Sequence, residues 1–196
     1  AVAPEAQRVR GAGDVRQHDR RGAAERDHQE PVEPNHDAAT IRSLTSLRMS
    51  YTAADGRQQI LSELESAIGE LAVAVATLGA AYERLDEHTA DRLEEQLFRP
   101  IQLAYGRAKR THSEFSGRYG IPPASFPEAS PGLESQDARA LIDRAATAAR
   151  QADDEIATLQ DSMLPVEVGD TELRAGLADV RSLIDPVPAR ATRLIS

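Results

Sequence analysis

The chain has 196 residues, of which 40% are hydrophobic, 28% are charged and 4% are aromatic, and it contains no Cys and no Trp. The lack of Cys excludes disulfides, thiolate metal sites and a cysteine nucleophile, and the formal net charge of −9 disfavours binding to nucleic acid or to an anionic membrane. A core must therefore be built from Ala, Leu, Ile and Val, which suits closely packed helices.

Residues 1–48 show no helical or strand-like apolar pattern, and we expect them to be a disordered leader. Their histidines, His18, His28 and His36, are too irregularly spaced to indicate a metal site. The leader is upstream sequence translated from a start placed too early, a genuine tail, or the mature N-terminus of an exported protein. We favour the first, because helical order begins just after Met49, and we expect residues 49–196 to form one domain.

A first helix is predicted over about residues 55–87. Its apolar residues follow alternating spacings of about four and three, as in a helix with one buried side: Leu64, Ile68, Leu71, Val75, Leu78, Tyr82 and Leu85. Small residues widen this surface, so we expect several helical neighbours.

A second helix is predicted to begin after an N-cap at Thr89 and to end at Gly120. Its buried side should comprise Leu93, Leu97, Ile101, Ala104, Ala108, Phe115 and Tyr119. Pro100 lies inside and lacks an N–H, so we expect a kink or a local break there.

Residues 121–134 form a connection with four prolines, which precedes a third helix over about residues 135–163. The expected buried residues of this helix are Leu141, Ala145, Ala148, Ala152, Ile156, Leu159 and Met163. A shorter fourth helix, capped by Asp170 or Thr171, should bury Leu173, Leu177, Val180 and Ile184 and end at Pro186 and Pro188, leaving a short tail.

These elements predict an all-α fold, namely an antiparallel up-down-up-down four-helix bundle with three long helices and one shorter C-terminal helix. Because the fourth helix is short, one side of the bundle should lack its partner. We expect either a second copy of the chain or the 121–134 connection to close this side, with a homodimer favoured.

No catalytic or metal-binding pattern is found. Position 85, three before His88, is Leu, and position 109, three before His112, is Lys, so the Glu-x-x-His pairs of di-iron bundles are missing. The chain has neither a Walker-type loop nor a GxGxxG pattern. We expect no cofactor, no metal and no catalytic residue, although an enzyme is not excluded.

The favoured function is therefore a non-enzymatic helical bundle that mediates protein association or self-assembly, with a homodimer or another protein as partner. Candidate partner-binding residues are Phe126, Arg107, Arg110 and Arg118. The alternative is a bundle that binds a small molecule or a metal near Tyr105 and His112. The composition, with a single Lys at position 109 among 23 basic residues, is typical of a high-GC bacterium, and we expect a cytoplasmic protein.

Overall fold

The protein is described from a computed structural model, which gives the backbone of residues 36–133 and 135–196 and the side chains of residues 53–133 and 135–196. Within these residues the fold is all-α, as predicted, and no strand occurs. The elements are α1 (His36–Tyr82), α2 (Glu87–Leu93), the π-helix η1 (Glu94–Phe98), α3 (Arg99–Arg118), α4 (Ala138–Asp161), α5 (Leu164–Glu167), α6 (Thr171–Ile184) and α7 (Val187–Leu194).

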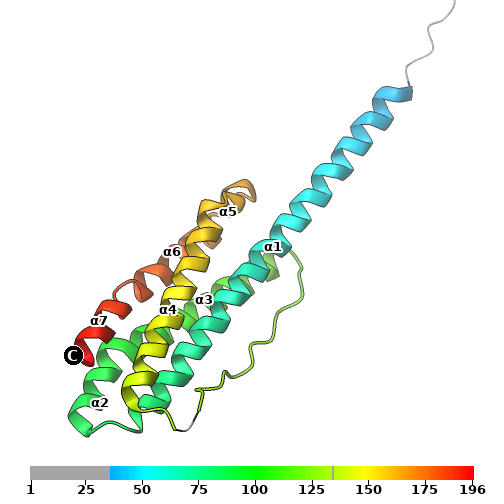
Figure 1. Cartoon of the computed structure of the whole chain (residues 1–196). Helices are drawn as coiled ribbons and strands as arrows, with labels where there is room; N and C mark the ends of the chain where they lie inside the picture. Colours follow the sequence, from blue (N-terminus) through cyan, green and yellow to red (C-terminus); the bar gives the residue numbers. More distant parts are fainter. Residues whose placement is uncertain (1–35, 134) are drawn as a thin grey trace, which may run out of the picture.

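Helix α1 begins much earlier than its apolar pattern. It starts at His36, so residues 36–48, which we expected to be part of a disordered leader, are helical. The sequence has no Pro or Gly from His36 to Asp55, and a nucleated helix propagates at little cost through such a stretch. This end of α1 projects beyond the other helices (Figure 1). Residues 1–35 of the predicted leader lie outside the described residues.

Helices α2 and α3 are joined through η1, directly before Pro100, where the irregularity was predicted. The Arg99 N–H bonds to the Glu94 carbonyl, five residues back, instead of the usual four. The start of α2 differs from the prediction, because Asp86 is its N-cap and accepts from the Thr89 N–H. Thr89 therefore lies inside the first turn.

The C-terminal part contains more helix than predicted. Asp170 caps α6 through the Leu173 N–H, as expected. Pro188, however, lies in the first turn of α7, where proline is tolerated because its missing N–H has no helical partner. The supposed tail is thus a helix that packs against α4 and η1. It fills the side that was expected to be open, so the main reason for a homodimer is removed.

The long helices form a four-membered arrangement, in which α1 packs on α3 and α4, and α6 packs on α3 and α4. Contacts between α1 and α3 join Arg57 to Tyr119 and Glu65 to His112, so the two helices are antiparallel. Helices α1 and α4 are also antiparallel, as drawn in Figure 1. Helices α3 and α4 consequently point the same way.

The predicted up-down-up-down order is therefore wrong for α3 and α4. The predicted connection, described over residues 121–133, is not a tight turn but a crossover that returns along the bundle (Figure 1). An extended segment of this length spans about 45 Å, whereas α3 with its 20 residues is about 30 Å long. The connection is long enough to make this return, and neighbouring helices still pack antiparallel.

The core was largely predicted from the apolar spacing. Every residue named for the second, third and fourth helices is buried except Tyr119, which is half-buried, and Met163, which is 52% exposed. Met163 follows the end of α4 and has a left-handed backbone, with φ of 63°. On α1 the buried face is centred on Leu64, Ile68, Leu71 and Leu78, while Val75 is half-buried.

Between Ala53 and Tyr82, α1 is long and apolar enough to cross a membrane by length and composition alone. Half of its most apolar stretch is buried inside the bundle. A core helix satisfies the same test, and the contacts of α1 with α3 and α4 account for its apolar surface.

Candidate functional site

The sequence-predicted residues are distributed over three places in the bundle. Arg107 and Arg110 line a groove between α3 and α6. Phe126 lines a second groove, between α1, α3 and the connection. Arg118 lies at the end of α3 against the start of α6. The structure therefore does not bring these four residues together into one site.

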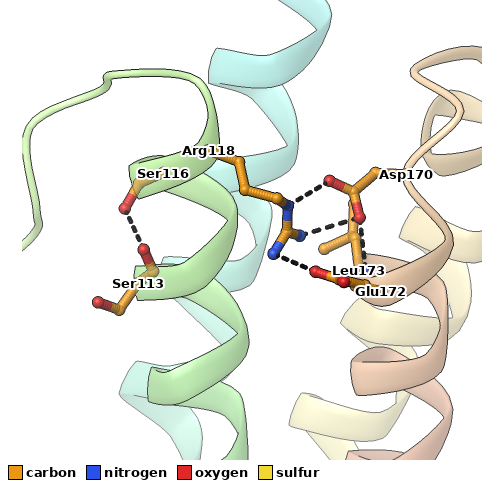
Figure 2. Close-up of polar contacts among 6 residues, drawn as sticks. All are labelled: Ser113, Ser116, Arg118, Asp170, Glu172 and Leu173. Atoms are coloured by element: carbon orange, nitrogen blue, oxygen red, sulfur yellow. Dashed lines mark hydrogen bonds and ion pairs between the residues drawn. The ribbon is translucent and has the colours of Figure 1, made fainter.

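Arg118 has a structural partner and is not available as a free cation. Its Nε and Nη2 donate to the two carboxylate oxygens of Asp170, each at 2.9 Å, and its Nη1 lies 2.8 Å from Glu172 Oε2 (Figure 2). Burial disfavours the charged carboxylate of Asp170, but the Leu173 N–H and the Arg118 guanidinium outweigh this effect and lower the pKa of Asp170. This contact fixes α3 to the N-terminus of α6.

The α3–α6 groove has a volume of about 500 Å³. Its lining residues are Gln102, Leu103, Gly106, Arg107, Arg110, Asp179, Ser182 and Leu183. Leu103 is 57% exposed although its neighbours along α3, Ile101 and Ala104, are fully buried. A large apolar side chain thus lies on the polar side of the helix.

The two arginines of this groove differ in their contacts. Arg107 Nη2 donates to Asp179 Oδ2 at 2.6 Å, which joins α3 to α6. The exposed Arg110 makes no ion pair or hydrogen bond with the part of the chain that the structure describes. The groove therefore combines an exposed leucine with a guanidinium whose charge is not compensated by a described neighbour.

The Phe126 groove has a volume of about 480 Å³ and is lined by three elements. Helix α1 contributes Ala72, Val75 and Ala76, α3 contributes Tyr105 and Lys109, and the connection contributes Phe126, Glu128 and Ala129. The ammonium of Lys109 lies 4.9 Å from the Tyr105 ring centroid and 5.7 Å from that of Phe126. Tyr105, one of the two residues named for a small-molecule site, therefore lines this groove.

His112, the other residue named for that site, lies behind the groove. It is only 2% exposed, and its Nε2 is 2.9 Å from Glu65 Oε1. Its ring meets that of Phe126 edge to face, with centroids 5.3 Å apart. His112 thus joins α3 to α1 and supports Phe126, while no group of three His, Asp or Glu side chains suited to a metal occurs among the described residues.

Sequence reasoning missed the residues that complete the two grooves. Leu103 could have been noticed, because it falls outside the apolar spacing of Leu97, Ile101 and Ala104. The role of Glu128 could not, because only the crossover path of the connection places it beside α1 and α3.

The described residues form an all-α bundle, and Arg107, Arg110, Tyr105 and Phe126 line two of its surface grooves. Comparison of the chain with protein-family models, with curated proteins and with solved structures finds no match.

Proposed function

We propose that the chain is a non-enzymatic helical bundle that associates with another protein through the α3–α6 groove. The partner would present an aliphatic side chain to Leu103 and a carboxylate to Arg110. The partner segment would therefore carry both an apolar and an acidic residue. It comes from a cytoplasmic protein or from a second copy of this chain, which is itself acidic.

The observation that carries the proposal is the pairing of an exposed apolar residue with an uncompensated cation. Leu103 is 57% exposed, and Arg110 lines the same groove. An apolar contact surrounded by polar groups is the usual anatomy of an interface, and Arg is enriched at such sites. The groove is small, which suits a short segment or one helix face better than an extensive dimer interface.

The test is site-specific photocrosslinking in the cell of origin. A photoreactive phenylalanine analogue at Gln102, beside Leu103, should crosslink to one protein, whereas the same group at the exposed Gln151 of α4 should not. The purified partner should then bind the bundle in calorimetry. Light scattering would show whether the partner is a second copy of this chain.

Matched variants locate the interface. Leu103→Asp and Arg110→Glu should each weaken binding by about tenfold or more, because one introduces a charge into an apolar contact and the other reverses an attractive one. Arg139→Glu makes the same charge change at the start of α4 and should leave affinity unchanged. Equal effects of Arg110→Glu and Arg139→Glu would refute the assignment of this groove.

A second candidate function is the binding of a small molecule near Tyr105 and His112. The observation in its favour is the volume of the Phe126 groove, about 480 Å³, which falls in the range of small-molecule pockets. The groove is independent of the α3–α6 groove, so the chain could have both functions. Metal binding at this place is not proposed, because His112 is buried against Glu65 and Phe126.

A further inference from the structure

We propose that the Phe126 groove binds a small amphiphilic carboxylate, with the carboxylate at Lys109 and the apolar tail on the alanine-rich surface of α1. This inference rests on the second candidate function and gives it a ligand class. It is separate from the proposed protein partner, which would occupy the other groove.

The first argument concerns the charge of Lys109, the only lysine of the chain. Its ammonium contacts the rings of Tyr105 and Phe126, and it makes no ion pair with a described residue. An ammonium has three N–H donors. The two ring faces attract its charge, but they do not accept its hydrogen bonds as a carboxylate would. The half-buried cation is therefore held at the groove with its donors available to an anion.

The second argument is the shape and polarity of the groove. Ala72 lies three residues before Val75 and four residues before Ala76, so the three side chains share one side of α1. Their small side chains leave space, and Phe126 closes the groove from the connection. An aliphatic or aromatic tail would bury apolar surface here, and the removal of apolar surface from water favours binding.

The third argument is the position of Glu128, which lines the same groove. Its carboxylate repels an anionic ligand but attracts a cationic one. The groove therefore has one group of each sign, and the effects of removing each group reveal the charge of the ligand. We commit to the anion because Lys109 is half-buried and held by two rings, whereas Glu128 is exposed.

The experiment uses the full chain and three probes with the same tail, namely octanoate, 1-octanol and octylammonium. Alanine residues carry ¹³C-labelled methyl groups, so that Ala72 and Ala76 report binding directly and the exposed Ala175 of α6 serves as the reference. Octanoate should shift the Ala72 and Ala76 signals in a saturable manner and leave Ala175 unchanged. It should bind at least about tenfold more tightly than octylammonium.

Two variants that each remove one charge provide the matched comparison. Lys109→Gln should weaken octanoate binding by about tenfold, and Glu128→Gln should strengthen it by about twofold or more. Circular dichroism and the unfolding temperature should match those of the parent, because both side chains line the surface of the groove.

The possible failures are distinguishable. If octanol or octylammonium binds at least as tightly as octanoate at Ala72 and Ala76, the site exists and the proposed ligand class is wrong. If none of the three probes shifts these methyl signals, both the ligand class and the second candidate function are overturned. Loss of octanoate binding in Glu128→Gln would also contradict the assigned polarity.

Discussion

Arg190 Nη1 donates a hydrogen bond to the main-chain oxygen of Gln96, at a distance of 3.3 Å. In a regular α-helix this oxygen would accept from the N–H of residue 100, but Pro100 has none. A side chain of α7 thus supplies the donor that proline removes, and α7 is tied to the irregular turn η1.

This relationship predicts a thermodynamic coupling between positions 100 and 190. Arg190→Met keeps the aliphatic stem but removes the donor, and it should lower the free energy of unfolding by about 1 kcal/mol. In a Pro100→Ala background the new N–H can bond to Gln96, so the same change should have a smaller effect. A double-mutant cycle by urea unfolding measures the difference, and simple additivity would contradict the prediction.

Gly176 allows α6 to approach α3 closely. A Cβ at this position would lie 2.7 Å from Thr111 Cγ2 and would also overlap Thr111 Oγ1. Gly176→Ala should therefore reduce stability by about 1–3 kcal/mol despite the better helix propensity of alanine. The matched control is Gly69→Ala on the exposed side of α1, where no atom lies within 4 Å of the added Cβ.

Gly69→Ala should increase stability by about 1 kcal/mol, because only the helix propensity changes. Thermal unfolding of the two variants should move in opposite directions. Stabilisation by both substitutions would show that α3 and α6 can separate at little cost.

The ion pair of Arg118 with Asp170 predicts a pH-dependent contribution to stability. The pKa of Asp170 is lowered from its usual value of 3.8, so the folded state favours the ionised carboxylate. Its contribution is present above pH 3.8 and is lost as the pH falls through the lower pKa of the folded state. Asp170→Asn should destabilise the protein by about 1–3 kcal/mol at pH 7.

This difference between parent and variant should shrink steadily in urea unfolding below about pH 4. Asp91→Asn, an exposed change on α2 without an ion pair in the described chain, should show no such trend. A deficit of Asp170→Asn that stays constant down to pH 2 would show that it does not come from the carboxylate charge, and would contradict the prediction.

The projecting end of α1 predicts a limit to truncation. The described core residues of α1 begin at Ile60, and the N-terminal end of α1 projects beyond the other helices (Figure 1). A chain starting at Met49 should therefore unfold within a few degrees of the full chain. A much larger loss would show that residues 1–48 stabilise the bundle. Circular dichroism during heating makes the comparison.

The buried faces could be predicted because they depend on helical periodicity alone. Leu173, Leu177, Val180 and Ile184 were identified in this way, and all are buried. Helix ends were less predictable, because the same residue type can stand either after the end of a helix or in its first turn. Pro188 was predicted to end a helix, but it occupies the first turn of α7. Thr89 was predicted to be the N-cap of the second helix, but Asp86 is the N-cap of α2.

The grooves could not be predicted because they depend on which helices become neighbours. Phe126 and Tyr105 were selected as isolated residues, and only the crossover brings Phe126 and Glu128 against α1 and α3. Arg118 was selected as a partner-binding cation, yet it forms an ion pair with Asp170 that joins α3 to α6. The sequence alone does not distinguish a cation that pairs within the fold from one that is free.

The crossover also affects how fast the chain can fold. Helix α1 makes its most extensive contacts with α4, which follows only after α2, α3 and residues 121–134. Such non-local pairing raises the contact order. The entropy of closing a larger loop must be lost before these contacts can stabilise the fold. We expect this bundle to fold more slowly than a four-helix bundle of equal length whose helices follow one another through short turns.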